Sequence, residues 1–189
     1  SARLLAYEEY FADRNRHRSP ADLVALGVAD QAIEFGGNKS PSGIHPPKDK
    51  ASSNSSATVA WAGLQSFTGD YDLQVEFPRD AGIVLARMLN SVANGDRATV
   101  LCTDGSTRDF LFRFYSKNGM WRLNVSNEAP DASWARQNKD GIAIVQVMED
   151  RKSVQFRILR PGRELDEVVA RSVGLGSWGK TSKRLYGWY

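Results

Sequence analysis

Hydrophobic and polar residues alternate in short runs between residues 73 and 159, and this period of two predicts half-buried β-strands. The clearest run, STRDFLFRFY, places Phe110, Phe112 and Phe114 on one side and Arg113 and Tyr115 on the other. Comparable strand patterns occupy residues 73–78, 97–105, 120–127, 142–147 and 153–159. The segment Lys117-Asn118-Gly119 is typical of a tight hairpin turn, so the middle of the chain predicts a sheet that contains hairpins.

A helical period interrupts the strands directly after residue 78. The apolar positions there fall on one face of a helix that Asp80 or its neighbours cap and that Asn94-Gly95 ends. The members of this face are Ile83, Val84, Leu85, Met88, Leu89 and Val92. Further helices are predicted over residues 2–14, from Ser19 to Gly27, and over residues 160–174.

The length and the composition predict one folded domain. At 189 residues the chain can bury a sizeable core, and 41% hydrophobic and 10% aromatic residues argue against dominant disorder. Residues 36–56 are rich in Gly, Pro, Ser and Lys, which predicts a long loop that either binds a partner or only connects. We expect residues 1–58, with helices and this loop, to pack on a unit formed by residues 59–189.

The same composition indicates a soluble, cytoplasmic protein. There is no apolar run of membrane-spanning length and no signal-peptide pattern. Cys102 is the only cysteine in the sequence, and its apolar strand predicts a buried, unreactive thiol. The formal charge of +3 permits an acidic partner without requiring one. The chain begins Ser-Ala without an initiator methionine, which indicates a piece cut from a longer polypeptide.

Enzyme signatures are scarce. His17 and His45 lie in polar connecting segments, and no nucleophile elbow, phosphate-binding loop or dinucleotide fingerprint occurs. Carboxylates are numerous, but surface solvation explains them, and none is arranged as a metal-dependent nuclease requires. We therefore expect no catalytic residue, metal, cofactor or small-molecule substrate for this chain, and no membrane partner.

Cationic, polar and aromatic side chains gather instead at two places. Around the predicted hairpin turn lie Arg113, Tyr115, Lys117, Asn118, Trp121 and Arg122. A two-stranded ribbon of this kind fits a major groove, where arginine reads guanine and asparagine reads adenine, although an ordinary exposed hairpin has the same composition. The C-terminal segment carries Lys180, Thr181, Lys183 and Arg184 between aromatic residues. This mixture suits phosphates and bases, with a solvent-exposed tail anchored by Trp188 as the alternative.

The order of the elements resembles the B3-type DNA-binding pseudobarrel of plant transcription factors, which specificity domains of some bacterial restriction endonucleases share. The resemblance covers residues 59–159 and includes the strand LQVEFP that runs into a helix. A Trp134-containing segment precedes the last strands, with Asp140-Gly141 in the inverse of the family order and without the Gly-Trp pair of plant members. The resemblance implies a mainly β (α+β) fold, a seven-stranded open pseudobarrel flanked by short helices.

In this family two arms grip the DNA, and the resemblance implies where they lie here. The first arm is residues 65–72, just before LQVEFP, and the second is residues 113–122, the hairpin. The contacts implied for the first arm are Ser66, Thr68, Asp70 and Tyr71. The N-terminal helices and the basic C-terminal segment look like the additions found in restriction-enzyme specificity domains.

The resemblance and the basic positions together predict sequence-specific binding of double-stranded DNA, as the target-recognition domain of a bacterial restriction endonuclease. The nuclease would then occupy another domain of the same polypeptide, and this chain itself would not be an enzyme. The alternatives are a small metal-dependent nuclease and a protein-interaction domain whose basic surface is incidental.

Overall fold

The computed structural model describes residues 56–65, 72–115, 119–181 and 184–189. The strands among these residues are β1 (Val59–Gly63), β2 (Leu73–Pro78), β3 (Ala93–Asn94), β4 (Arg97–Leu101), β5 (Thr107–Tyr115), β6 (Met120–Val125), β7 (Ile142–Val147), β8 (Val154–Leu159), β9 (Trp178–Lys180) and β10 (Leu185–Trp188). The helices among them are α3 (Arg79–Asn90), α4 (Ala132–Gln137) and α5 (Arg163–Leu175).

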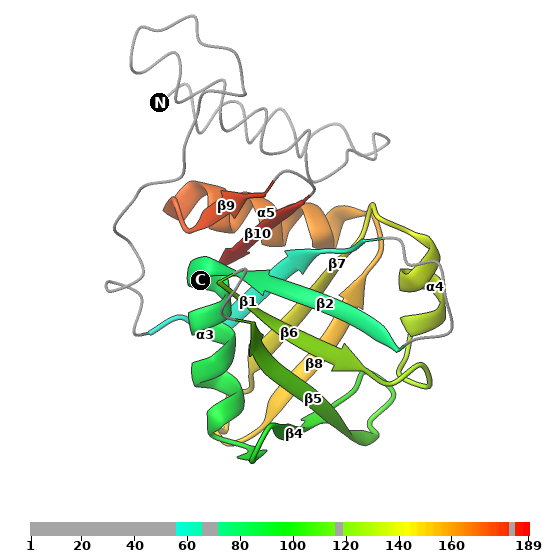
Figure 1. Ribbon diagram of the computed structural model, residues 1–189. Helices are drawn as coiled ribbons and strands as arrows, with labels where there is room; N and C mark the ends of the chain where they lie inside the picture. Colours follow the sequence, from blue (N-terminus) through cyan, green and yellow to red (C-terminus); the bar gives the residue numbers. More distant parts are fainter. Residues whose placement is uncertain (1–55, 66–71, 116–118, 182–183) are drawn as a thin grey trace, which may run out of the picture.

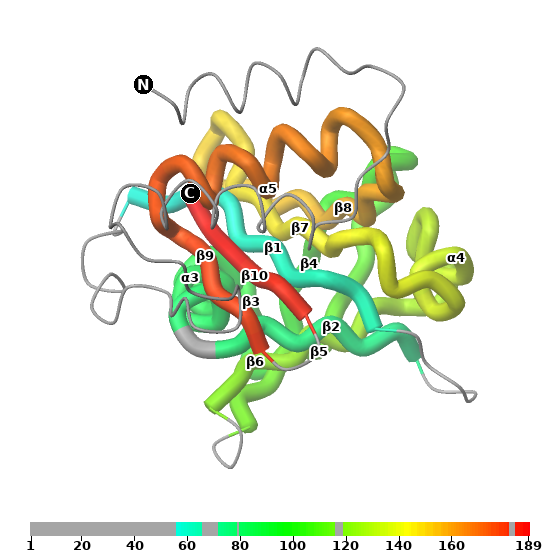
Figure 2. The backbone as a smooth tube through the Cα atoms, turned by 90° about the horizontal axis from the view of Figure 1, so that it is seen from above, coloured from blue at the N-terminus to red at the C-terminus, as the bar shows by residue number. Residues whose placement is uncertain are grey.

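The strands form one sheet in the order β2-β6-β5-β4-β8-β7-β1-β10-β9, with β3 beside β4. The β4–β8 pair is parallel and the neighbouring pairs are antiparallel. The sheet curls into an open half-barrel, and α3 packs against its inner side (Figures 1 and 2). This confirms the mainly β class with few helices, but the described residues form a 10-stranded sheet and not the predicted seven strands.

The additional strands include β9 and β10, in the segment that the sequence suggests as a basic contact surface. Trp178 and Tyr186 in these strands are buried. Backbone and aromatic rings approach closely there, because a Cβ at Gly187 would lie 2.7 Å from the Trp61 ring and one at Gly179 would lie 2.3 Å from the Tyr186 ring. Glycines that make room for rings interrupt the hydrophobic alternation, so these strands leave only a weak pattern in the sequence.

Two hydrophobic clusters lie on opposite faces of the sheet. The inner cluster fills the half-barrel beneath α3, where the rings of Phe110 and Phe156 meet edge to face at 5.1 Å between centroids. The outer cluster joins α5 to β1, β7 and β10, and in it Nε1 of Trp61 donates a hydrogen bond of 2.7 Å to Oγ of Ser172. The described helices therefore cover the outer face of β1, β7 and β10 and leave the outer face of β2, β6, β5 and β4 open.

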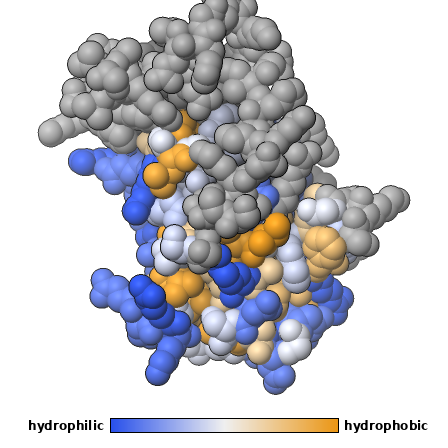
Figure 3. Space-filling model, turned by 90° about the vertical axis from the view of Figure 1, so that its left-hand side faces the viewer, coloured by the Kyte–Doolittle hydropathy of each residue, from blue (hydrophilic) through white to orange (hydrophobic). Residues whose placement is uncertain are grey.

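Helix α3 follows the prediction on its buried face and departs from it at both ends. Four of the predicted apolar positions are buried, namely Val84, Leu85, Met88 and Leu89. Ile83 is 55% exposed. The face of the molecule that contains α3 shows hydrophobic patches among hydrophilic side chains (Figure 3). Pro78 and not Asp80 is the N-cap, and the helix ends at Asn90 because the residues of β3 pair with β4.

Helix α4 lies in the Trp134-containing segment, where the sequence predicts no helix. Ala132 and Ala135 are its buried residues, and Asp131 precedes it at a φ of 62°. Helix α5 agrees with the helix predicted over residues 160–174 and ends at Gly176 with a φ of 65°. In α4, two buried alanines and the partly buried Trp134 hold a short helix whose remaining positions are polar.

The remaining predictions divide into confirmed and untested ones. Cys102 is buried as predicted, and its burial raises the pKa of the thiol. In the described part of the chain no helix is long and apolar enough to cross a membrane. The helices predicted over residues 2–14 and from Ser19 to Gly27, and residues 36–55 of the predicted loop, lie outside the described residues.

Candidate nucleic-acid interface

The open outer face of β2, β6, β5 and β4 carries the described polar residues of the predicted hairpin contact. The strand register places Glu76 opposite Arg122 and Arg122 opposite Arg113, so these three residues form one row across the sheet. A neighbouring row contains Asn124 on β6 and ends at Arg97 on β4. This face therefore presents guanidinium and amide groups, the side chains that most often read base edges.

Arg113 is the most exposed cation of the first row, with 57% of its side chain accessible. Its Nε donates a hydrogen bond of 2.8 Å to Oδ2 of Asp96, and this bond holds the pKa of Asp96 below its ordinary value. Water screens both partners, so the ion pair contributes little to stability. Arg113 can therefore exchange the carboxylate for a phosphate or a guanine edge at small cost.

Glu76 is the centre of a largely buried ionic cluster beside this face. Nη2 of Arg122 donates to its Oε1 at 2.7 Å, Nη2 of Arg184 donates to its Oε2, and Nε2 of Gln65 donates to the same oxygen at 3.2 Å. The guanidinium of Arg122 also lies 4.2 Å from the centroid of the Tyr115 ring. We call these five residues, Gln65, Glu76, Tyr115, Arg122 and Arg184, the Glu76 cluster.

Burial makes the ion pairs of the Glu76 cluster structural. The side chains of Glu76 and Arg184 are only 15% and 6% exposed. Desolvation alone would raise the pKa of Glu76, but the hydrogen bonds and charges of Arg184 and Arg122 outweigh it and hold this pKa below its ordinary value. Removal of one partner from such a buried ion pair leaves an uncompensated charge and costs about 3–5 kcal/mol in typical proteins.

The Glu76 cluster joins the two ends of the sheet. In the strand order β2 stands at one end and β9 at the other, and among the described strands no ladder links β2 to β1, β9 or β10. Glu76 on β2 nevertheless binds Arg184, which lies 108 positions further along the chain and directly before β10. Side chains thus close the side of the half-barrel that the backbone hydrogen bonds leave open.

The residues predicted in the C-terminal segment consequently differ in their surroundings. Arg184 is buried against Glu76, so we remove it from the surface that contacts a partner, and Arg122 is similarly engaged at 22% exposure. Thr181 closes the turn before β10, since its backbone N–H donates to the carbonyl of Arg184 at 2.8 Å. Lys180 at the end of β9 is exposed and remains a candidate contact.

Trp121 and Phe114 lie on the other side of the hairpin from Arg113. The ring of Trp121 stacks on Phe112 at 5.5 Å between centroids and lies so close to α3 that a Cβ at Gly82 would be 2.9 Å away. Phe114 lies 5.4 Å from Trp121 between centroids but is 54% exposed, so the predicted inward row of phenylalanines is buried only as far as Phe112. Trp121 therefore anchors the hairpin to α3, and the polar side of the hairpin faces outward.

The other predicted contacts, Ser66, Thr68, Asp70, Tyr71, Lys117, Asn118 and Lys183, lie outside the described residues. The described residues that border their segments do come together. Gln65 precedes residues 66–71, Tyr115 precedes residues 116–118, and Arg184 follows residues 182–183. All three border residues belong to the Glu76 cluster, so the chain enters or leaves the three segments beside one ionic cluster.

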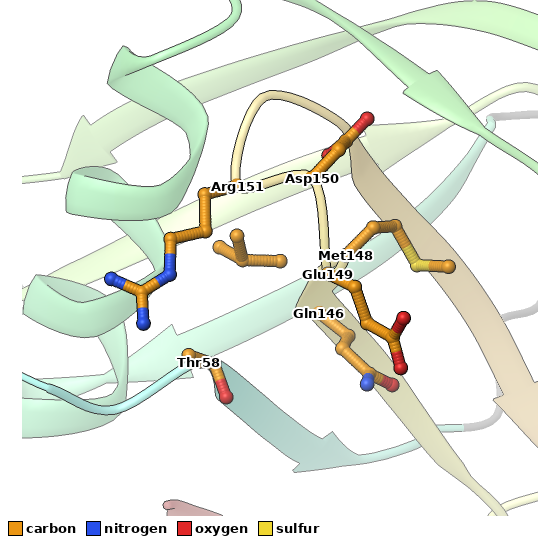
Figure 4. Close-up of a pocket in the computed structure, with 7 residues that line it drawn as sticks. Thr58, Gln146, Met148, Glu149, Asp150 and Arg151 are labelled. Carbon is orange, nitrogen blue, oxygen red and sulfur yellow. The ribbon is translucent and has the colours of Figure 1, made fainter.

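A separate open pocket of about 830 Å³ lies at the turn between β7 and β8. Thr58 and residues 146–151 line it (Figure 4). Asp150 shapes the turn by accepting hydrogen bonds from the backbone N–H and the hydroxyl of Ser153. The sequence carries no motif that points to this pocket. Within the described ranges, no three His, Cys, Asp or Glu side chains are grouped closely enough to hold a metal ion.

The described residues thus define a mainly β domain with a curled open sheet, an arginine-bearing outer face and a buried ionic cluster at the open side of the sheet. No protein family, curated protein or solved structure matches the chain. Evidence for a function therefore comes from the chemistry of this face.

Proposed function

We propose that this chain binds double-stranded DNA at a specific short sequence, as the target-recognition domain of a bacterial restriction endonuclease. The observation that carries the proposal is the convergence of Gln65, Tyr115 and Arg184 in one cluster beside the exposed Arg113. Described residues that lie beside one another on one side of the sheet can contact one duplex together. The curled sheet is also compatible with a B3-like pseudobarrel, the fold that the sequence pattern suggests.

The chemistry of the hairpin fits direct reading of bases. Arginine forms a bidentate contact with the O6 and N7 atoms of guanine, and a two-stranded ribbon fits a major groove about 12 Å wide. Arg113 projects from the outer side of β5, and Arg97 lies on the same face of the adjacent β4. We assign base reading to Arg113 and phosphate contacts to Arg97 and Lys180.

Catalysis is assigned elsewhere in this proposal. The cleavage of DNA would belong to a nuclease domain of the same polypeptide, and the present chain would select the sequence. The partner of the chain is then double-stranded DNA together with that nuclease, and the bacterial cytoplasm is the compartment in which such a protein acts.

The test is a selection of bound duplexes from a random pool, followed by titration of the best duplex against a scrambled one. We expect a Kd of about 10 nM or tighter for the selected duplex at moderate salt, and a steep loss of affinity as salt rises. Lys183→Ala should lower the salt slope by about one if that lysine holds a phosphate. A selected duplex that binds no better than scrambled DNA would exclude sequence recognition, and magnesium-dependent cleavage of a plasmid by the isolated chain would favour the nuclease alternative.

A further inference from the structure

We infer that Glu76 is a positioning residue for DNA recognition, which sets the distance between the β5–β6 hairpin and the turn before β10. This inference rests on the proposed function. Glu76 itself would not touch the DNA, because only 15% of its side chain is exposed and both carboxylate oxygens already accept hydrogen bonds from the chain.

The division of contacts between the two oxygens explains how one side chain sets this distance. Oε1 binds Arg122, on the β6 half of the hairpin, and Oε2 binds Arg184, at the start of β10. Arg122 in turn lies against the ring of Tyr115, the last residue of β5. A planar carboxylate between two guanidinium groups fixes direction as well as distance.

Stability alone does not account for this arrangement. The Nε atoms of Arg122 and Arg184 are buried without a hydrogen-bond partner among the described residues, and an unmade bond of this kind is unfavourable. Well-packed hydrophobic residues of similar volume often replace a buried ion pair without loss of stability. A directional cluster is therefore explained better by the need to hold the hairpin that carries Arg113 and the strand end that carries Lys180 at a fixed distance from each other.

Glu76→Gln tests the inference, with Asp109→Asn as the matched control. Asp109 is an exposed carboxylate on the outer side of β5, hydrogen-bonded to Thr99, so its substitution removes the same charge outside the cluster. Each variant should bind scrambled DNA slightly more tightly, because a negative charge is lost. Glu76→Gln alone should also lower the ratio of specific to scrambled affinity by about tenfold or more, as the loss of one bidentate base contact does.

A DNA-free measurement separates positioning from unfolding. Spin labels at Phe114 and Lys180, both exposed, report the distance between the β5–β6 hairpin and the end of β9, beside the turn before β10, in a Cys102→Ser background. We expect a narrow distance distribution in the parent and in Asp109→Asn, and a broader or shifted one in Glu76→Gln at a temperature where circular dichroism shows a folded chain.

The outcomes distinguish a failure of the positioning role of Glu76 from a failure of the proposed function. If the parent prefers its selected duplex and Glu76→Gln keeps the full preference, the positioning role is wrong and the proposed function stands. If the parent itself shows no preference, both are wrong. If the preference falls while the distance distribution stays unchanged, Glu76 acts in some way other than positioning, and the inference is likewise overturned.

Discussion

Arg113→Ala tests the outer face most directly, because it removes an exposed side chain from the predicted recognition ribbon without touching the core. Arg113 has 57% of its side chain exposed, and its ion pair within the described residues is the one to Asp96, so the variant should fold normally, with a shift in Tm of about 2 °C or less. The lost base contact should relax the preference at one or two base pairs by roughly 5- to 150-fold, the range expected for a bidentate arginine–guanine contact.

The assay is a base-by-base binding profile of the selected duplex, with every position changed in turn. Arg97→Ala is the matched control, because Arg97 is exposed on the same face of β4 and its loss changes the charge equally. Arg97→Ala should weaken the binding of all duplexes to a similar extent and lower the salt slope by about one, whereas Arg113→Ala should leave the binding of scrambled DNA nearly constant. Only Arg113→Ala should change the profile of base preference, and identical profiles in the two variants would refute base reading by Arg113.

Three further predictions concern the fold. Gly187→Ala should destabilise the folded chain by about 1–3 kcal/mol in urea unfolding, because the new Cβ would lie 2.7 Å from the Trp61 ring. Gly174→Ala, which places a Cβ in open space, should not destabilise the chain. Cys102 should react with a thiol reagent only at the rate of unfolding, since burial raises its pKa, and fast labelling of folded chain would disprove this. Folding lowers the pKa of Glu76, so its ionised carboxylate stabilises the folded chain. The difference in free energy of unfolding between the parent and Glu76→Gln should therefore be largest above the ordinary glutamate pKa and shrink as the pH falls through the pKa of the folded state. A difference that stays constant with pH would exclude this linkage.

Local patterns predicted the elements whose side chains alternate between core and solvent. Strand β5 and the buried face of α3 are examples, because each position is decided by its near neighbours in sequence. The sequence pattern did not predict strands β9 and β10, because Gly179 and Gly187 make room for rings that come from elsewhere in the chain. The pattern did not predict helix α4 either, because its two buried alanines give too weak an apolar period.

The candidate site shows the same division between local and distant causes. The sequence places Arg113, Arg122 and Arg184 in one category, as cations beside aromatic residues, and the structure separates them by burial. Arg113 has a carboxylate partner that water screens, whereas Arg122 and Arg184 share Glu76 away from water. The partner of Arg184 is 108 positions away, so no local pattern shows that its charge is neutralised.

Burial therefore decides which arginine is free to bind and which one holds the fold. Loss of an exposed pair costs little, while a buried carboxylate left with one arginine, or two arginines left without it, is costly. Substitution of Arg184 should accordingly destabilise the chain much more than substitution of Arg113, whatever each does to DNA binding. Equal loss of stability in Arg113→Ala and Arg184→Ala, measured by urea unfolding, would show that the Glu76 cluster does not close the open side of the sheet.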